Sequence, residues 1–142
     1  MTASLPDTIA AASRLIEARK LSPVELVEGL LARVASIDPV INAFLTVTGD
    51  EAIRQARRAE VEMSKGAYRG ALHGIPFGLK DIYETAGIRT TGHSKVYANH
   101  VPTVNAATVD KLFDAGGKLA NEATHKFLHA VLLGWIESNV KT

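Results

Sequence analysis

The chain has 142 residues, of which 46% are hydrophobic and 22% charged, a balance typical of a globular domain and unlike that of a disordered chain. The formal net charge is +1 with both signs interspersed, so no basic stripe indicates a nucleic-acid partner and no polybasic patch indicates a membrane surface. The sequence contains no cysteine, which excludes disulfides and thiolate metal sites and is compatible with the cytoplasmic location that we expect.

Neither a secretory signal nor a membrane-spanning segment is predicted. The first residues, Met1–Asp7, carry neither a basic head nor an apolar stretch. The longest uninterrupted apolar run covers residues 130–136, and a spanning helix needs roughly 18 such residues. We therefore expect no membrane partner.

Two helices are predicted before residue 40. The first runs over residues 8–20, with Asp7 as its N-cap and one apolar stripe. The second begins at Ser22-Pro-Val-Glu25, in which the serine is the N-cap, the proline takes the first helical position and the glutamate completes a capping box. Apolar residues at spacings of three and four predict a broad buried face, and Asp38-Pro39 is expected to end this helix.

A short strand and a third helix are predicted next. Residues 41–47 alternate apolar and other side chains, which is typical of a strand, and Gly49-Asp50 then turns the chain into a helix that carries Ile53 and Met63. Several charged residues on this helix are interpreted as a solvated, salt-bridged face and not as a binding patch. They are Arg54, Arg57, Arg58, Glu60 and Glu62.

The stretch Gly70–Asp81 presents one lysine at the end of a strand-like run. Alternate residues of Ile75–Leu79 are apolar, which is the period of two expected of a strand. Two interpretations of Lys80 follow: it pairs with Asp81 or extends into solvent, or it is desolvated, loses its proton and acts as a base. The spacing of a phosphate-binding loop is absent, because aspartate follows the lysine.

A loop and a further helix follow the lysine. The segment Tyr83–Pro102 is rich in Gly, Thr and His and has little periodicity, so we expect a ligand-facing loop. Asn105 is then expected to cap a helix that stops at Gly116-Gly117.

Two consecutive motifs resemble the amidase signature family. They are His73-Gly-Ile-Pro-Phe-Gly-Leu-Lys-Asp81 and Thr85-Ala-Gly-Ile-Arg-Thr-Thr-Gly-His-Ser94, and the resemblance runs from about Thr8 to Gly116. Members of that family hydrolyse amides with a Ser-cisSer-Lys triad, in which the lysine of the first motif is the base. The resemblance therefore implies that Lys80 is the catalytic lysine.

The resemblance also implies that both serines lie in later Gly/Ser-rich segments. No such segment occurs before Thr142. Ser94 is the serine nearest to Lys80 in sequence, and its position in the second motif implies that it shapes the site and does not attack the substrate. Because the family builds its acyl pocket largely from later segments, no substrate-binding residue is predicted.

An α/β fold is implied, with helices around a partial mixed β-sheet as in the N-terminal part of the amidase signature fold. We expect residues 1–142 to form a single domain whose residues 118–142 are a divergent tail, in which Lys126 stands where the family has glutamate. Such a tail would follow from an early stop, a change of reading frame or an engineered boundary.

The histidines predict neither a metal site nor a cofactor. His125 and His129 have the spacing of a helical metal-binding pair, but lysine follows His125 where a zincin has glutamate, and no third ligand is indicated. A solvent-facing pair is therefore expected. His73, His93 and His100 flank the lysine and its loop, and backbone hydrogen bonding is the expected role of each.

Two functions remain open from the sequence. In the first, the protein belongs to an amidase-type hydrolase that cleaves a small-molecule carboxylic amide to acid and ammonia or amine, with Lys80 as base. In the second, it is a non-catalytic, truncated amidase fragment or an assembly partner without the serine nucleophile. Self-association is also expected, because a strand over residues 75–82 needs neighbours at both edges.

Overall fold

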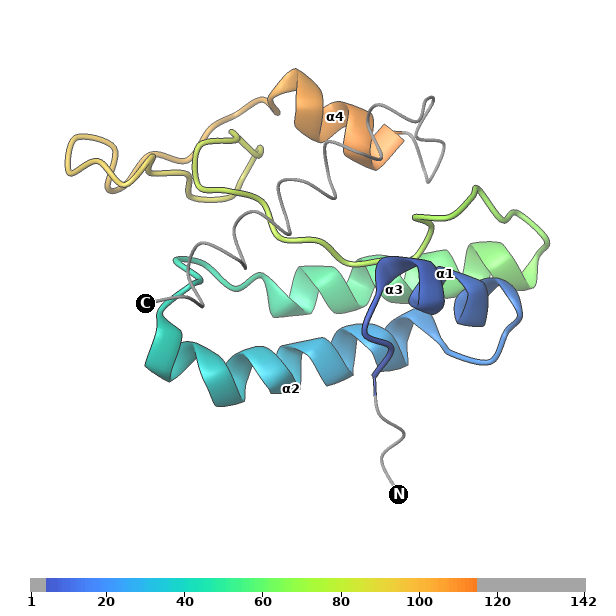
Figure 1. Cartoon of the computed structure of the whole chain (residues 1–142). Helices are drawn as coiled ribbons and strands as arrows, with labels where there is room; N and C mark the ends of the chain where they lie inside the picture. The colour runs from blue at the N-terminus through green and yellow to red at the C-terminus, as the bar shows by residue number, and fades with distance from the viewer. Residues whose placement is uncertain (1–4, 115–142) are drawn as a thin grey trace.

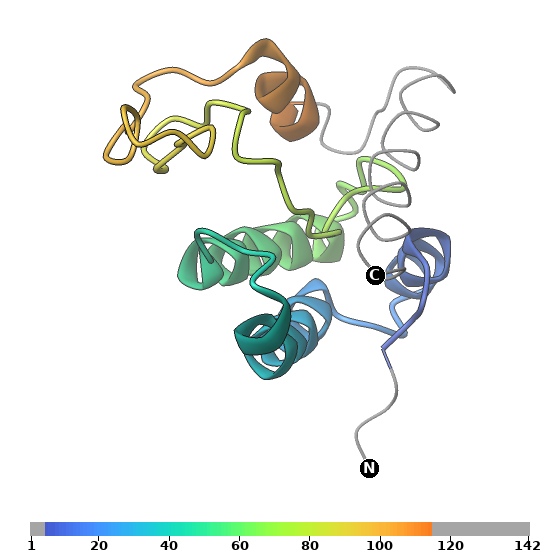
Figure 2. The same ribbon diagram turned by 60° about the vertical axis from the view of Figure 1, so that its left-hand side comes forward.

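The computed structural model describes residues 5–114, and within that range the chain forms four helices (Figure 1). The helices are α1 (Ile9–Glu17), α2 (Pro23–Ile41), α3 (Gly49–Ser64) and α4 (Ala107–Asp114). α2 and α3 pack side by side with α1 across one end, while the loop of residues 83–106 and α4 lie on the opposite side of α3 from α2 (Figure 1, Figure 2). The segment that carries Lys80 joins these two parts of the molecule.

The predicted capping box of α2 is confirmed. The Ser22 hydroxyl accepts the N–H of Val24 at 2.9 Å, and the Glu25 carboxylate accepts the N–H of Ser22 at 2.9 Å. α1 is shorter than predicted and has a different cap, because the hydroxyl of Thr8, and not Asp7, accepts the N–H of Ala11 at 3.1 Å. Local side-chain chemistry therefore sets both helix starts.

The predicted end of α2 at Asp38-Pro39 is wrong, because the helix includes Pro39 and continues to Ile41. A proline costs a helix one hydrogen bond, but near the last turn few bonds remain to be lost. The Asp38 carboxylate accepts the N–H groups of Ala43 and Phe44 at 2.7 and 3.1 Å, and Asn42 takes the left-handed conformation (φ 50°) that closes the helix. These contacts stabilise the extra turn.

The strands predicted at residues 41–47 and 75–82 do not form in the described part of the chain. The β-structure found there is one isolated antiparallel bridge between Thr85 and Ile88. An alternating pattern shows which residues suit a strand, but a strand also needs a neighbour to take up its N–H and C=O groups. The helices expected for this fold are present in residues 5–114, whereas the partial mixed sheet is not found within that range.

The hydrophobic core lies where α1, α2 and α3 meet. Ala12 and Ile16 of α1 and Leu26 of α2 are almost completely buried. Partly buried side chains from every neighbouring segment pack on them: Leu5, Leu21, Leu30, Met63 and Ile75. Ile75 thereby anchors the start of the lysine-bearing segment to the helical layer.

The loop before α4 is closed by hydrogen bonds across its base. Gly87 donates to the carbonyl of Pro102 at 2.9 Å, and Thr90 donates to that of His100 at 3.0 Å. Asn105 takes part in this closure, since its side-chain oxygen accepts the N–H of Ala86 at 2.7 Å. The prediction that Asn105 caps the helix is wrong, because α4 begins at Ala107 and the asparagine oxygen is engaged elsewhere.

Several predictions lie outside the described residues. These concern the helix stop at Gly116-Gly117, the divergent tail at 118–142 and the pair His125 and His129. Among the helices of residues 5–114, none is long and apolar enough to cross a membrane.

Candidate active site

The lysine-bearing segment starts at a tight contact with α2. Gly74 has a φ of +82°, and a Cβ at this position would lie 2.8 Å from Cγ of Pro23. Only glycine combines this backbone conformation with so close an approach. From there the segment passes over α3 and reaches Lys80 without entering a helix or a sheet (Figure 1).

Lys80 is exposed in the described part of the protein. Its carbonyl accepts the N–H groups of Ile82 and Tyr83 at 2.7 and 3.0 Å, so a tight turn follows the lysine directly. The Lys80 ammonium makes no hydrogen bond or ion pair with any residue in the range 5–114, so the pairing with Asp81 that the first interpretation allowed does not occur there. Residues 5–114 thus present the lysine but do not desolvate it.

Asp81 is occupied with the loop that follows. One carboxylate oxygen accepts the N–H of Thr91 at 2.8 Å, and the other accepts the hydroxyl of Thr91 and the N–H of His93 at 3.2 Å. The Asp81 carbonyl accepts the N–H of Gly92 at 2.7 Å. The second motif is therefore folded back onto the residue next to the lysine, and His93 is held in the left-handed region with a φ of 56°.

These contacts explain the charge state of Asp81. Partial burial acts to raise the pKa of this carboxyl, but the hydrogen bonds from Thr91 and His93 and the charge of Arg89 outweigh it, so the pKa lies below its ordinary value. Arg89 also donates to the carbonyl of Leu45 at 3.3 Å, which ties the loop to the connection between α2 and α3.

The other residues of the second motif have local roles. The Ser94 hydroxyl accepts the N–H of Val96 at 3.2 Å, as in a turn. His100 lies 3.1 Å from a Glu84 carboxylate oxygen through Nε2, and its ring meets that of Tyr97 edge to face. These residues shape the loop around Asp81.

His73 belongs to a second cluster of side chains, which forms around Glu62 of α3. Its Nε2 lies 3.0 Å from a Glu62 carboxylate oxygen, and its Nδ1 accepts the backbone N–H of Arg69 at 3.2 Å. Glu62 also pairs with Arg69 and with Arg58. The charged face predicted on this helix is present, but the pattern of residues did not indicate that Glu62 reaches across to the first motif.

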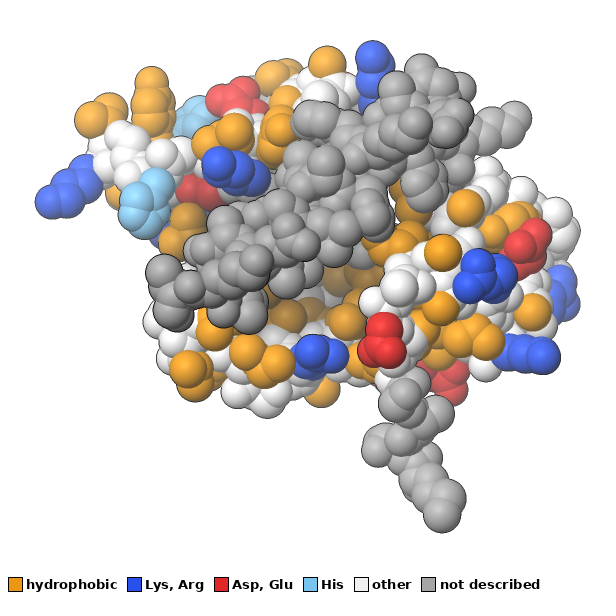
Figure 3. Space-filling view, viewed as in Figure 1, with side chains coloured by type: hydrophobic (Ala, Val, Ile, Leu, Met, Phe, Trp, Pro, Cys, Tyr) orange, Lys and Arg blue, Asp and Glu red, His pale blue; other side chains and the backbone are white. Residues whose placement is uncertain are grey.

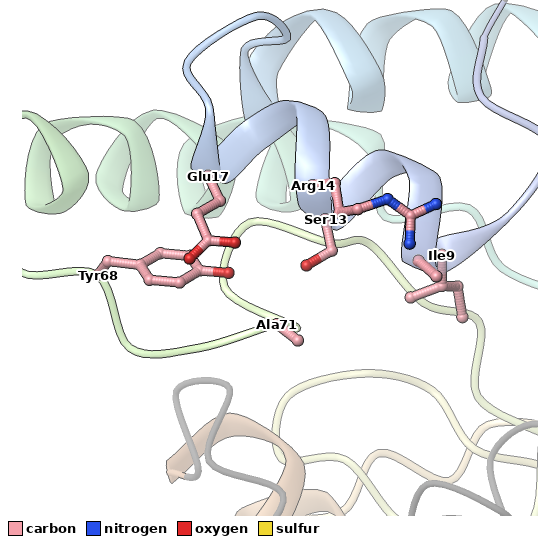
Figure 4. Close-up of a pocket in the computed structure, with 7 residues that line it drawn as sticks. Ile9, Ser13, Arg14, Glu17, Tyr68 and Ala71 are labelled. Atoms are coloured by element: carbon pink, nitrogen blue, oxygen red, sulfur yellow. The ribbon is translucent and has the colours of Figure 1, made fainter.

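A hollow of about 340 Å³ lies between α1 and the turn at Tyr68 (Figure 4). Charged and hydroxyl side chains border it together with small apolar ones: Ile9, Ala10, Ser13, Arg14, Glu17, Tyr68 and Ala71. Lys80 does not line it. The sequence did not predict this hollow, because its two walls are more than fifty positions apart in the chain and only the fold brings them together.

Within residues 5–114 no three His, Asp or Glu side chains come together as a metal ion would require. The candidate active site consists of Lys80 with the Asp81-bound loop beside it.

Residues 25–122 match the amidase family. The chain belongs to this family. The match spans both motifs, so the resemblance recognised in the sequence is confirmed.

The curated relatives are components of a larger enzyme, glutamyl-tRNA(Gln) amidotransferase. This chain is 43% identical over 119 residues to the A subunit of that enzyme from Dehalococcoides mccartyi, covering 84% of this chain and 24% of that protein. It is 41% identical over 109 residues to the counterpart from Azotobacter vinelandii, covering 77% and 22%. It is 39% identical over 112 residues to the mitochondrial counterpart from Ornithorhynchus anatinus, covering 79% and 21%. The chain thus spans about a quarter of the length of these relatives.

A solved structure shares the fold. It superposes with a TM-score of 0.73 at 25% identity, covering 78% of this chain and 24% of the other, and is described as "An unexpected vestigial protein complex reveals the evolutionary origins of an s-triazine catabolic enzyme". The match supports an amidase-type fold for the chain, although residues 5–114 themselves contain no sheet.

Proposed function

We propose that this chain supplies the proton-handling lysine of an amidase-type site that hydrolyses a small-molecule carboxylic amide to acid and ammonia or amine. The observation that carries the proposal is the amidase match over residues 25–122, which includes the motif His73–Asp81 and its lysine. In this proposal Lys80 takes the proton from a serine that attacks the amide carbon and returns it to the leaving amine. The acyl-serine is then released by water.

The arrangement around Asp81 supports this role. A base acts well only when the backbone that carries it is held in place. The turn after Lys80 and the hydrogen bonds that Asp81 accepts from Thr91 and His93 hold the backbone that follows the lysine. Asp81 is in this proposal a positioning residue, while Lys80 is the group that handles the proton.

The serines and the surroundings that desolvate Lys80 are proposed to come from polypeptide outside residues 1–142. Two observations support this: Lys80 is exposed among the described residues, and the relatives are about four times as long as the matched stretch. Since those relatives are components of an amidotransferase, assembly with further polypeptide is part of the proposal.

The test is a chimera in which residues 25–116 replace the matching stretch of a curated relative, with that relative's own amidotransferase activity as the readout. We expect the chimera to be active and Lys80→Ala to lower kcat by at least about a thousandfold, as loss of one member of such a unit does. Lys80→Arg should lower it nearly as much, because a guanidinium does not release its proton near neutral pH. Lys65→Ala, at the exposed end of α3, is the matched control and should leave kcat within about twofold.

Full activity of the arginine variant would show that Lys80 acts only as a fixed positive charge, and the base would lie elsewhere. The isolated polypeptide of residues 1–142 should show no amide turnover above background, because an acyl-transfer site needs a nucleophile, a base and oxyanion donors together. Turnover by this polypeptide that persists after further purification would contradict that expectation.

The alternative is that this chain is a non-catalytic assembly partner with an amidase-derived fold. In that case the chain self-associates or binds a second polypeptide. The structural match to a chain described as part of a vestigial complex favours this possibility. The chimera separates the two functions. Activity that depends on Lys80 supports the enzyme, whereas an assembled, correctly folded chimera with no activity supports the assembly partner.

A further inference from the structure

His73 is a buried titratable side chain to which the proposed chemistry assigns no task. The residue is 7% exposed and lies in the turn between α3 and the lysine-bearing segment. A buried imidazole needs partners for both ring nitrogens, and here each nitrogen has one.

The two contacts identify the tautomer. Nδ1 accepts the N–H of Arg69 at 3.2 Å, so it carries no proton in this arrangement. Nε2, 3.0 Å from the Glu62 carboxylate, must then carry the hydrogen and donate it. The ring is therefore neutral and joins the backbone of the turn to the side chain of α3.

The groups around His73 keep it neutral. Burial is the main reason that its pKa lies below the ordinary value, and the charge of Arg69 adds to this effect. Glu62 acts in the opposite direction, but its carboxylate is shared with Arg69 and with Arg58. Tyr68 is the other titratable side chain near the ring, with the ring centroids 6.2 Å apart.

The turn bound by His73 leads directly into the lysine-bearing segment. The N–H of His73 donates to the carbonyl of Gly70 at 2.9 Å, and the N–H of Ile75 donates to that of Leu72 at 3.1 Å. The next contact is Gly74 against Pro23 of α2. The path from residue 69 to residue 75 is thus fixed at α3 through His73 and at α2 through Gly74.

We propose that neutral His73 is a positioning residue, which holds the turn of residues 69–74 on α3. It thereby sets the path of the segment that ends at Lys80. Protonation of Nδ1 releases this turn. A protonated Nδ1 would point its hydrogen at the N–H of Arg69, and that hydrogen bond would be lost. The effect of His73 on catalysis rests on the proposed function, whereas the effect of His73 on the position of the turn does not.

The pH dependence follows from the direction of the shift. Because folding lowers the pKa of this base, the turn is fully held above about pH 6.5 and is released as the pH falls through the lower pKa of the folded state. Asp81 and Glu62 remain ionised when the pH first falls below about 6.5, since the pKa of each lies below its ordinary acidic value.

The first test uses nitrogen-15 NMR on the full 142-residue chain. At about pH 7.5 the His73 ring should be the Nε2–H tautomer, and the hydrogen-exchange protection of the Arg69 amide should fall at least about tenfold once the same titration shows the His73 ring protonated. The amide of Gly92, bound to the Asp81 carbonyl, is the internal control and should keep its protection. An Nδ1–H tautomer at about pH 7.5, or unchanged protection of the Arg69 amide after the His73 ring has been protonated, would overturn the proposal.

The second test uses two substitutions that each preserve one contact. His73→Asn keeps an acceptor near Nδ1, so protection of the Arg69 amide should persist and become independent of pH. His73→Gln keeps a donor near Nε2 for Glu62 but should lose most of that protection even at pH 7.5. Equal protection in the two variants would contradict the assignment, and the measurement on the unsubstituted chain decides the question if either variant does not fold.

The chimera adds a catalytic readout. His73→Asn should reduce the loss of kcat on acidification to the part that protonation of Lys80 causes, while leaving KM within about twofold, whereas His73→Gln should lower kcat at every pH. If the chimera has no activity, the proposed function fails, and the NMR tests still decide the role of His73.

Discussion

At the scale of single residues, Asp81 shows how a motif that is named for its lysine depends on the residue beside it. The carboxylate receives three hydrogen bonds from Thr91 and His93, which come from a segment ten to twelve residues further along. Such bonds to a charged group are each worth about 1.5–3 kcal/mol when they are well formed. Asp81 is therefore committed to holding the loop and is not available to neutralise Lys80.

Replacing Asp81 by asparagine tests this role. Asp81→Asn should lower the free energy of unfolding by about 1–2 kcal/mol at pH 7, because the charge that strengthens these bonds is lost. Since folding lowers the pKa of Asp81, the contribution is present above about pH 4 and disappears as the pH falls through the lowered pKa, so the two proteins should become equally stable at low pH.

Urea unfolding as a function of pH measures both effects. Glu28→Gln, on the exposed face of α2, is the matched control and should change stability by less than about 0.5 kcal/mol. A difference between Asp81→Asn and the parent chain that is independent of pH would show that the carboxylate charge is not what holds the loop.

At the scale of elements, one glycine determines how the lysine-bearing segment leaves the helical layer. Gly74 combines a φ of +82° with an approach to Pro23 in which an added Cβ would lie 2.8 Å from Cγ. Gly66 has nearly the same φ, +81°, but nothing lies within 4 Å of its added Cβ. Substitutions at the two glycines therefore distinguish the cost of backbone strain, which both positions share, from the cost of steric contact, which arises only at Gly74.

The two alanine variants should differ by the cost of that contact. Gly66→Ala should destabilise the fold by about 1–2 kcal/mol through the left-handed backbone alone. Gly74→Ala should cost about 1–3 kcal/mol more, because its methyl group also collides with α2. Thermal unfolding of both variants provides the comparison.

A double variant checks the origin of the extra cost. Pro23→Ala removes the ring atom nearest to the added Cβ, so it should recover part of the stability lost in Gly74→Ala and none of that lost in Gly66→Ala. Strictly additive effects of Gly74→Ala and Pro23→Ala would show that the contact does not limit the segment.

At the scale of the whole molecule, the end of α2 and the connection after it expose large hydrophobic side chains. Val40 is 81% exposed and Ile41 56%, and Phe44, Leu45 and Val47 are also exposed. Hydrophobic side chains are visible on the face of the molecule over α2 in Figure 3. A hollow of about 440 Å³ lies beside them, between Leu31, Pro39 and Val47. Contiguous apolar surface of this kind favours association.

Self-association of the isolated chain therefore remains a prediction, and we expect it to involve the exposed apolar surface at the end of α2. Val40→Lys combined with Ile41→Lys should weaken association at least about tenfold, because burial of each such side chain is worth on the order of 1 kcal/mol. Val96→Lys, at a loop position that is 86% exposed, is the matched control. Sedimentation velocity over a range of concentrations measures the effect, and a compact monomer throughout would refute the prediction.

The sequence by itself determined the features that depend on neighbouring residues. The capping box at Ser22 and Glu25 involves atoms within one helical turn, so its residue types predict its geometry. The motif that ends in Lys80-Asp81 is likewise contiguous, and its residue types alone were enough to indicate the family. The salt-bridged face of α3 followed from residues three and four apart, and the pairs Arg54–Glu51 and Arg58–Glu62 are present.

Only the tertiary structure decided the choices between distant partners. Arg89 reaches Leu45 across 44 positions, and Glu62 turns from its own helix to His73 across 11. The same limit explains why the strand predicted at residues 75–82 does not form. An alternating pattern determines which side chains share a face, but it does not determine whether another strand lies alongside. Hydrogen-bond partners of this kind are set by the path of the whole chain, and no local pattern of residue types contains that information.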